Sequence, residues 1–444
     1  MKTLMIAAMH SGAGKTVTTC ALLAALKQRG EPLRAFKCGP DYIDPMFHER
    51  VLHVPSRNLD LFLQGEEGAM KTLSRAEADL ALIEGAMGYY DGLNNTTVAS
   101  AYALARLTKT PAVLVITPGG SGLTLAAQVK GLANFRPDSG IAALILANCP
   151  ERRFVSLAPV LEREAGLPVL GYLPPMEEAH FESRHLGLLT AGEIGDLSTR
   201  IGKLGEAAER CIDLDRLLSL AGTTAASPKP TAPSSRCRIS VARDEAFCFT
   251  YADNLDALEE AGAELIFFSP LHDLELPNAD GLYLPGGYPE LYAEALSENR
   301  AMVDSITAAV KAGLPTVAEC GGFLYLGQSL EDEKGRARPM CGLLPGAGFK
   351  TGRLQRFGYQ TITAPADSLL FRAGEQIPAH EFHYWDSTQN GADLIASKAD
   401  GRSWDCGYVS PHLYAAFPHL HFGGALPLAQ RFVKACEQWK ASMT

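Results

Sequence analysis

Short apolar runs alternate with longer stretches whose apolar residues recur at helical spacing, and this alternation extends over most of the chain. The runs predicted as buried strands are 5–9, 80–83, 112–116, 142–146 and 169–172 in the first half, and 238–241, 264–268, 281–284 and 316–319 in the second. The stretches predicted as helices include 16–29, 98–107, 123–133, 254–261 and 300–311. Strands that alternate with helices are typical of βαβ units. The pattern therefore predicts an α/β fold with two open, doubly wound sheets.

A segment of small, polar and proline residues divides the chain nearly in half. Its sequence is TTAASPKPTAPSSR, residues 223–236, and it has no apolar period with which to bury itself. At about 150 residues per domain, a chain of 444 residues has room for two or three domains. We therefore predict a first domain over 1–222, a linker over 223–237 and a second domain over 238–444.

The composition narrows the possible partners and the compartment. A net charge of −10, without a basic stripe, disfavours nucleic acid. No apolar run approaches the roughly 20 residues of a membrane span, and the chain enters a strand at its start, so we expect no membrane segment and no targeting peptide. The ten cysteines include no C-x-x-C pair, which favours a reducing cytosol over a disulfide framework or a zinc site. We expect a cytoplasmic protein.

The segment MIAAMHSGAGKT, residues 5–16, places a Gly-rich turn between a predicted strand and a predicted helix. Glycines allow the backbone to approach phosphate oxygens, the helix N-terminus points N–H groups at them, a lysine adds positive charge and a threonine hydroxyl can bind Mg²⁺. Met9 stands where the usual phosphate-loop pattern has its first glycine, so the loop is a variant. The residues predicted to bind nucleotide are Gly12, Ala13, Gly14, Lys15 and Thr16.

Two further segments of the first half carry carboxylates near predicted strands. In KCGPDYIDP, Asp41 and Asp44 lie three residues apart, in a segment that begins at Lys37. In ALIEGAMGYYDG, Glu84 ends an apolar strand and Asp91 follows on a loop. Ligands of open α/β sheets bind at such strand ends, and a carboxylate there can hold the Mg²⁺ that bridges nucleotide phosphates. Turn chemistry or a solvated loop charge is the alternative for these acids.

Weaker signals come from two other segments. Asn148 lies at another predicted strand end, where its amide can read a base edge. Arg184 and His185, in SRHLGLL, follow a Pro-rich turn.

In the second half, TVAECGGFLYL reads as a strand, a cysteine, two glycines and a helix start, which predicts a nucleophile elbow at Cys320. We expect the helix N-terminus to lower the pKa of the thiol. Gly286 and Gly287 follow another predicted strand, where their N–H groups can form an oxyanion hole. His419 and His421 lie two residues apart in HLHF, and either can act as the base.

Taken in order, these motifs resemble the cobyrinic acid a,c-diamide synthase family over nearly the whole chain. The segments that carry the resemblance are SGAGKT, CGPDYIDP, RNLDLFL, IEGAMGYYDG, GYLPP with RHLGL, VARDEAFCFTY, LPGGYPE, AECGGFLYL, HEFHY and HLHF. The resemblance implies a P-loop NTPase domain like dethiobiotin synthetase, followed by a class I glutamine amidotransferase-like domain. It also implies a carbon–nitrogen ligase that uses glutamine as amido donor.

The reaction implied is conversion of the a and c acetate side chains of cobyrinic acid, a corrin, to acetamides in cobalamin biosynthesis. ATP with Mg²⁺ would form an acyl phosphate, and ammonia would come from Cys320-dependent hydrolysis of glutamine. By resemblance, Thr16 and Glu84 bind the metal, Asp41 and Asp44 lie near the reacting carboxylate, and Asn148 reads adenine. A homodimer is a possible assembly of the chain.

The chain departs from the related glutaminases at the catalytic base. Class I glutaminases usually carry a glutamate two residues after the catalytic histidine, but His421 holds that place relative to His419. We therefore expect a Cys320–His419 dyad. In HEFHY, His380 and His383 are three apart in an alternating, strand-like segment, so we expect a structural or substrate-side role rather than a zinc site.

Three other readings stay open from the sequence. The same amidation could act on another tetrapyrrole, such as nickel-sirohydrochlorin or hydrogenobyrinic acid. A P-loop switch ATPase of the partition type would leave the Cys320 half unexplained. Cobyric acid synthase amidates other side chains, and the intact CGPDYIDP, RNLDLFL and HLHF segments argue for the a,c enzyme.

Overall fold

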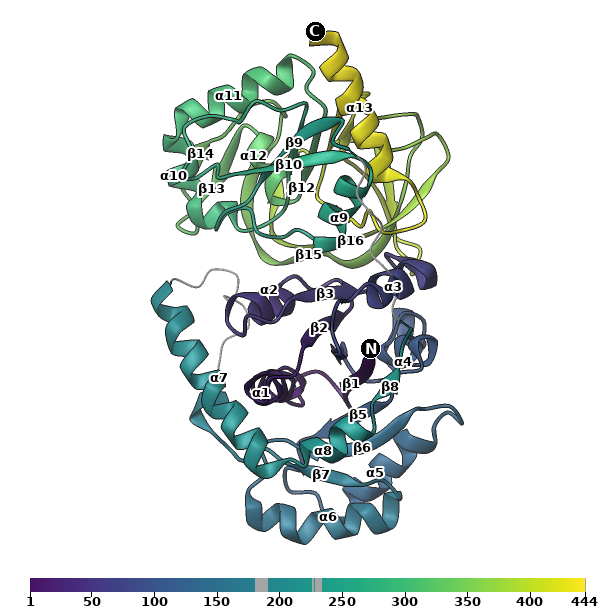
Figure 1. Ribbon diagram of the computed structural model, residues 1–444. Helices are drawn as coiled ribbons and strands as arrows, with labels where there is room; N and C mark the ends of the chain where they lie inside the picture. Colours follow the sequence, from purple (N-terminus) through teal and green to yellow (C-terminus); the bar gives the residue numbers. More distant parts are fainter. Residues whose placement is uncertain (180–190, 226, 228–233, 444) are drawn as a thin grey trace. The chain divides into compact units, whose positions relative to one another are not determined.

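The computed structural model describes residues 1–179, 191–225, 227 and 234–443 (Figure 1). The chain forms two compact units. The first comprises Met1–Leu61 and Gly65–Lys229, and the second comprises Phe62–Gln64 and Pro230–Thr444. Among the described residues, no helix is long and apolar enough to cross a membrane.

A sheet of parallel strands forms the centre of the first unit. Its order is β3-β2-β4-β1-β5-β6-β7, and the short β8 pairs antiparallel with β1. β2 and β3 lie on one side of β4 and β1, and β5, β6 and β7 lie on the other, so ligands are expected at the carboxyl ends of these two central strands. The strands are β1 (Lys2–Ala8), β2 (Leu33–Cys38), β3 (Ser56–Leu59), β4 (Leu80–Glu84), β5 (Ala112–Ile116), β6 (Ile141–Leu146), β7 (Val169–Tyr172) and β8 (Gly222–Thr223).

Helices cover both faces of this sheet, because successive residues of a strand point to opposite faces. On β1, Leu4 and Ile6 pack with α1, α2, α7 and α8, whereas Met5 and Ala7 pack with α3, α4, α5 and α6. The long α7 runs alongside α1 (Figure 1). The helices are α1 (Lys15–Gln28), α2 (Ile43–Arg50), α3 (Gly65–Ser74), α4 (Ala101–Thr108), α5 (Leu123–Asn134), α6 (Glu151–Ala165), α7 (Ala191–Cys211) and α8 (Leu214–Ser219).

The second unit also contains a mainly parallel sheet, with the order β10-β9-β11-β12-β20-β19. Its first five strands are parallel, and β19 pairs antiparallel with β20. Helices α9 and α13 pack on one face of this sheet, and α10, α11 and α12 pack on the other. These elements are β9 (Cys237–Ala242), α9 (Ala252–Glu260), β10 (Ala263–Phe268), β11 (Gly281–Leu284), α10 (Ala293–Glu298), α11 (Arg300–Lys311), β12 (Thr316–Glu319), α12 (Gly321–Leu326), β19 (Tyr408–Val409), β20 (Leu413–Ala416) and α13 (Leu428–Met443).

A second, mixed sheet completes this unit and was not part of the sequence prediction. Its order is β14-β13-β15-β16-β21, and β17 pairs with β15 and β18. The long β15 and β16 form an antiparallel pair whose register shifts twice, between Lys350 and Gln355 and between Gln355 and Gly358. The strands are β13 (Ser329–Glu331), β14 (Ala337–Pro339), β15 (Ala347–Thr363), β16 (Gln376–Ser387), β17 (Leu394–Ser397), β18 (Ser403–Cys406) and β21 (His419–Leu420).

The predicted fold class is confirmed, and the predicted strands and helices are present with small shifts at their ends. Two larger differences are three residues long: β1 begins at Lys2 rather than at residue 5, and the helix predicted over 98–107 begins only at Ala101. Ser100 caps it, since the Ser100 hydroxyl accepts a hydrogen bond from the N–H of Ala103 at 3.1 Å. Ala99 has a φ of 58°, which a right-handed helix does not allow.

Candidate functional site

The phosphate-loop candidate of the first unit turns through two glycines with left-handed backbone. Gly12 has a φ of 77° and Gly14 a φ of 89°, values that residues with a Cβ rarely adopt. A Cβ on Gly14 would also lie 3.1 Å from the Cβ of Ala147. Helix α1 starts directly after this turn, at Lys15, so its first N–H groups face the loop.

The Lys15 ammonium is bound by backbone carbonyl groups at the loop. It donates hydrogen bonds to the carbonyl oxygens of Met87 at 2.5 Å and His10 at 3.2 Å. Burial, and then the nearby charge of Lys37, lower the pKa of Lys15 to about 8. The side chain predicted to contact phosphate is therefore held at the loop by carbonyl groups that an anionic ligand can replace.

A buried network of charges joins the two acidic segments predicted from the sequence. Lys37 pairs with Glu84 across the β2–β4 register, and its ammonium lies 2.8 Å from Glu84 Oε1 and against the carboxylate of Asp44. The Thr16 hydroxyl donates to the same Oε1 at 2.7 Å. His48 Nε2 lies 3.7 Å from Glu84 Oε2. The structure thus brings Thr16, Lys37, Asp44 and Glu84 together at the carboxyl ends of the central strands.

Charge pairing decides the protonation of this network. Burial by itself lowers the pKa of Lys37, but the carboxylates of Asp44 and Glu84 outweigh it and raise that pKa above its ordinary value. Burial, followed by the charge of Asp44, raises the pKa of Glu84. Burial lowers the pKa of His48 to about 4, so this imidazole is neutral near pH 7.

The pKa values of the neighbouring carboxyl groups Asp41 and Asp44 shift in opposite directions. Burial, and then the charge of Asp44, raise the pKa of Asp41 to about 7. Burial also acts to raise the pKa of Asp44, but the pairing with Lys37 lowers it below its ordinary value. Asp41 Oδ1 accepts a hydrogen bond from the N–H of Ile43 at 2.7 Å, which fixes the carboxyl at the start of α2. At neutral pH, Asp41 is therefore partly protonated, whereas Asp44 carries a charge.

The oxygen donors of Thr16 and Glu84 suit Mg²⁺, a hard cation. Within the described residues, Glu84 Oε2 is buried and makes no hydrogen bond, so an oxygen is left for a ligand. In the same part of the chain, no group of three or more His, Cys, Asp or Glu side chains is placed to bind a metal ion. An ion here would take its other ligands from phosphate oxygens and water, as Mg²⁺ commonly does.

Other predicted residues of the first unit lie apart from this network or outside the described residues. Asn148 follows β6 with a φ of 48° and is exposed. Asp91 closes its own turn, since its Oδ2 accepts a hydrogen bond from the N–H of Gly88 at 3.1 Å. Arg184 and His185 lie outside the residues that the structure describes.

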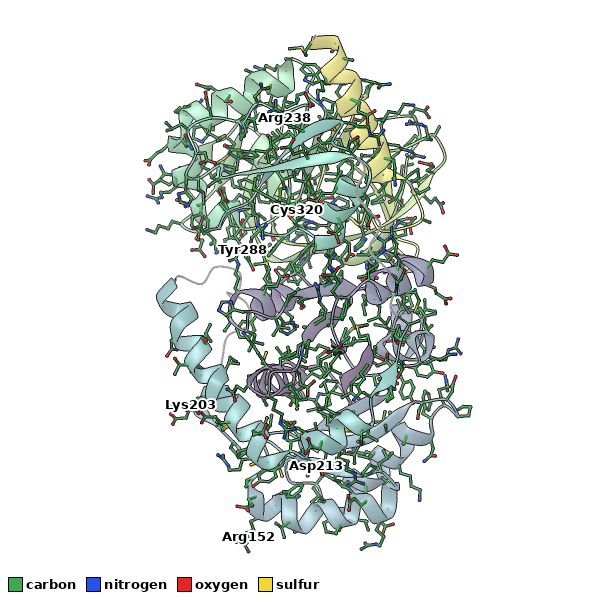
Figure 2. All side chains as sticks on the ribbon, in the orientation of Figure 1. Arg152, Lys203, Asp213, Arg238, Tyr288 and Cys320 are labelled. Atoms are coloured by element: carbon green, nitrogen blue, oxygen red, sulfur yellow. The ribbon has the colours of Figure 1, made fainter. Side chains whose placement is uncertain are left out.

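In the second unit, Cys320 occupies a sharp turn between β12 and α12 (Figure 2 labels its position). It has a φ of 47° and a ψ of −98°, a strained conformation for a residue with a side chain. Its N–H donates to the carbonyl of Ala416 on β20 at 2.8 Å, which anchors the turn. A Cβ on Gly322 would come within 2.2 Å of the Leu284 carbonyl oxygen, so the elbow requires glycine there. This is the geometry of a nucleophile elbow.

The expectation of a lowered thiol pKa is wrong for the protein without substrate. Burial, and then the carboxyl groups of Glu290 and Glu381, raise the pKa of Cys320 well above its ordinary value. The N–H of Gly321 acts in the opposite direction, but one amide of a six-residue helix does not outweigh burial. The thiol is therefore neutral and needs a base.

His419 lies against the glycine pair that follows β11. A Cβ on Gly286 would come within 2.4 Å of His419 Cε1 and 3.3 Å of its Nε2, so the imidazole occupies the space that a side chain would fill. Gly287 has a φ of 156°, and its nitrogen lies 3.1 Å from the position of a Cβ on Gly321, beside the elbow. The structure thus gathers Cys320, His419 and both glycines at adjacent strand ends.

His421 occupies a different environment. Its ring lies 4.8 Å from that of Tyr251, and its Nδ1 accepts a hydrogen bond from the N–H of Gly423 at 3.1 Å. These contacts hold it within its own turn. Of the two histidines, His419 is the one that the fold places against the predicted oxyanion hole.

The HEFHY segment lies on β16 and forms a buried polar cluster. Glu381 Oε1 lies 2.6 Å from His383 Nε2 and 2.7 Å from Arg356 Nε, and its Oε2 accepts from Gln360 at 2.8 Å. The ring of His383 stacks on Phe417, with centroids 3.9 Å apart. Because Glu381 also acts on the Cys320 thiol, this cluster lies near the nucleophile.

Two buried residues of these sites were not singled out from the sequence. His48 lies four residues after Asp44 on α2, so helical spacing was a signal that could have found it. Glu319 ends β12 immediately before Cys320 and is 1% exposed. A carboxylate at the end of an apolar strand is the same signal that pointed to Glu84.

Comparisons with known proteins identify a domain in each half of the chain. Residues 4–188 match the CobQ/CobB/MinD/ParA nucleotide binding domain, which implies ATP binding, and residues 238–426 match the CobB/CobQ-like glutamine amidotransferase domain. A nucleotide-binding domain and a glutamine amidotransferase domain in one chain define a glutamine-dependent amidating ligase.

Curated relatives extend over nearly the whole chain. Proteins named cobyrinate a,c-diamide synthase from Clostridium acetobutylicum and Caldanaerobacter subterraneus subsp. tengcongensis are 39% and 38% identical, over 98% of this chain and 100% and 98% of their own. The protein of that name from Listeria monocytogenes serotype 4b is 39% identical over 95% of this chain and 96% of its own. The chain belongs to the cobyrinate a,c-diamide synthase family.

Replacement of Asp41 by Asn should change the pH dependence of stability. The folded protein holds a proton on Asp41 up to about pH 7, whereas the unfolded chain releases it near pH ~4, so stability falls as the pH rises between these values. Asp41→Asn removes this loss. We expect its melting temperature, relative to wild type, to be about 5–10 °C higher at pH 8 than at pH 5.

Asp44→Asn is the matched control. It removes the carboxylate that pairs with Lys37, so it should lower the melting temperature at both pH values. An equal difference between Asp41→Asn and wild type at pH 5 and pH 8 would contradict the assignment of the proton.

Replacement of Gly286 by Ala should displace His419, because the new Cβ would lie 2.4 Å from Cε1. We expect glutamine-dependent amidation to fall roughly 100-fold, and amidation with added ammonia to stay within about twofold of wild type. Gly352→Ala is the control, since a Cβ at Gly352 meets no atom within 4 Å. Equal activity of both variants with glutamine would contradict the placement of His419.

Proposed function

We propose that this chain converts the a and c acetate side chains of cobyrinic acid to acetamides, with ATP and glutamine as co-substrates. The observation that carries the proposal is full-length similarity, at 38–39% identity, to relatives named cobyrinate a,c-diamide synthase. The residues that the two half-reactions need are gathered at strand ends in each unit, which supports the same conclusion.

The first unit activates the carboxylate. A carboxylate is a poor acyl donor at neutral pH, so the γ-phosphoryl group of ATP is transferred to it to form an acyl phosphate. The Lys15 ammonium and the amides at the start of α1 stabilise the charge on the transferred group. Thr16 and Glu84 are the residues that would hold Mg²⁺, which supplies further charge neutralisation on the phosphates. Asn148 would contact the adenine.

Ammonia then attacks the carbonyl carbon of the acyl phosphate, and phosphate leaves. The attacking nitrogen must lose a proton before the neutral amide is complete. A carboxyl group whose pKa is about 7 exchanges protons readily near neutral pH, which suits Asp41 to this step. Asp41 accepts this proton in its deprotonated form, and Asp44 stays charged beside Lys37.

The second unit releases ammonia from glutamine. His419 takes the proton of the Cys320 thiol, and the sulfur attacks the side-chain amide carbon of glutamine. The N–H groups at Gly286 and Gly287 receive the oxyanion of the tetrahedral intermediate. His419 returns the proton to the leaving nitrogen, ammonia departs, and water hydrolyses the thioester to glutamate.

Replacement of Cys320 by Ala, assayed beside wild type, tests the separate roles of the two units and the identity of the tetrapyrrole substrate. Wild-type protein should add two amides to cobyrinic acid with glutamine, and it should turn over ATP faster with this corrin than with nickel-sirohydrochlorin. Cys320→Ala should lose glutamine-dependent amidation by about 10³-fold or more and regain it with ammonium chloride. Mass spectrometry of the corrin measures both amides.

Each outcome separates the parts of the proposal. ATP turnover with the nickel compound only would retain the chemistry and reject the corrin. Glutamine-dependent amidation by Cys320→Ala would reject the nucleophile. Glutaminase activity without amidation of either tetrapyrrole would reject the ligase assignment.

Replacement of Glu84 by Gln tests the metal ligand. The carboxylate is fully buried beside the Thr16 hydroxyl, and loss of its charge should raise the Mg²⁺ concentration for half-maximal ATP turnover by at least about tenfold. Amidation should fall with glutamine and with ammonia alike, whereas glutamine hydrolysis should stay within about twofold. Asp91→Asn, on an exposed turn, is the control and should leave the Mg²⁺ requirement unchanged. An unchanged requirement in Glu84→Gln would contradict the assignment.

A further inference from the structure

Glu319, the residue immediately before the nucleophile, directs a buried carboxylate toward the predicted base. Its Oε2 lies 3.8 Å from His419 Nδ1, and both side chains are at most 2% exposed. The carboxylate therefore lies at Nδ1, whereas the Cε1–Nε2 edge of the same ring faces Gly286.

Hydrogen bonds from two other elements hold this carboxylate in place. Oε1 accepts from the N–H of Leu420 at 3.0 Å, and Oε2 accepts from the Tyr283 hydroxyl at 3.0 Å. Asn254 donates to the carbonyl of Leu420 at 2.9 Å, so both backbone groups of Leu420 are bound. The strand that carries His419 is thus tied directly to the strand that precedes Cys320.

The chemistry of the base calls for an anion at this position. When His419 takes the thiol proton, the imidazole becomes a buried cation, and an anion beside Nδ1 stabilises that cation and orients the ring. The sequence departs from other glutaminases because His421 stands where a glutamate usually follows the catalytic histidine. Glu319 supplies a carboxylate to the same imidazole from a different strand.

We infer that Glu319 is the positioning residue of the glutaminase site and completes a Cys320–His419–Glu319 triad. This inference rests on the proposed function of the second unit. The 3.8 Å separation lies within the range of an ion pair, which is the interaction that a protonated His419 would make with Glu319.

Other titratable groups around the site do not take this role. His380, opposite His419 in the β16–β21 register, has its pKa lowered to about 3 by burial and by His419, so it carries no charge near pH 7. Tyr283 faces the Glu319 carboxylate as a hydrogen-bond donor. Glu290 and Glu381 act on the Cys320 thiol, and Glu381 is paired with Arg356 and His383.

Replacement of Glu319 by Gln separates charge from structure. The amide oxygen can still accept from the N–H of Leu420, and the amide nitrogen can donate to the Tyr283 oxygen. The substitution therefore removes the charge and the acceptor of the Tyr283 hydroxyl proton, and the second loss is measured separately by Tyr283→Phe. We expect kcat for glutamine hydrolysis to fall about 10²–10⁴-fold with KM within about threefold. The acid limb of the pH–rate profile should move to lower pH, because the imidazolium loses its anion. Amidation with ammonia should be unchanged.

Tyr283→Phe is the matched control, since it removes one hydrogen bond to Oε2 and leaves the carboxylate. We expect its kcat to fall no more than about tenfold. The acid limb of its pH–rate profile should stay at the wild-type pH. If Glu319 only anchors the backbone, Glu319→Gln should resemble wild type within about threefold and show no shift of the limb. That result would overturn the inference.

A second variant covers the case in which Glu319→Gln does not fold. Glu319→Asp keeps the charge but withdraws it by one methylene, so kcat should fall at least about tenfold while KM and ammonia-dependent amidation stay near wild type. A wild-type kcat in Glu319→Asp would contradict the inference. Failure of the proposed function is distinguishable, because it appears as glutamine hydrolysis by Cys320→Ala or as no hydrolysis by wild type.

Discussion

The ion pairs of Lys37 with Asp44 and Glu84 are the interaction on which the first site depends. An ammonium group with so little solvent is stable only beside carboxylates, and each carboxylate is stable only beside the ammonium. The β2–β4 register places Lys37 next to Glu84, and the start of α2 brings Asp44 to both. The nearby carboxyl of Asp41 has its pKa raised to about 7 by burial and then by the charge of Asp44.

The same constraint shapes the second site with different residues. The buried carboxylate of Glu319 is held by the Tyr283 hydroxyl and the Leu420 N–H, and it lies beside His419. Burial keeps the thiol of Cys320 neutral. A neutral thiol resists oxidation, since the thiolate is the reactive form.

Glycines give both sites their close packing. Gly14 turns the phosphate loop into α1, Gly286 leaves room for the imidazole of His419, and Gly322 lets α12 begin against the Leu284 carbonyl. At each of these positions a Cβ would meet another atom at 3.1 Å or less. Groups at the ends of neighbouring strands can approach one another this closely only where the backbone carries no side chain.

The sequence by itself determined the fold class, the phosphate-loop candidate and the nucleophile elbow, because apolar period and glycine spacing are local signals. It did not predict the second sheet of β13 to β18 and β21, whose long β15 is half exposed and bends at two register shifts. Only the tertiary structure decided that His419 rather than His421 lies beside Gly286, and that Glu319 faces it. The tertiary structure also raises the pKa of Cys320, which the sequence predicted to be lowered. These outcomes depend on which residues, distant in sequence, share one buried volume, and neither periodicity nor motif spacing carries that information.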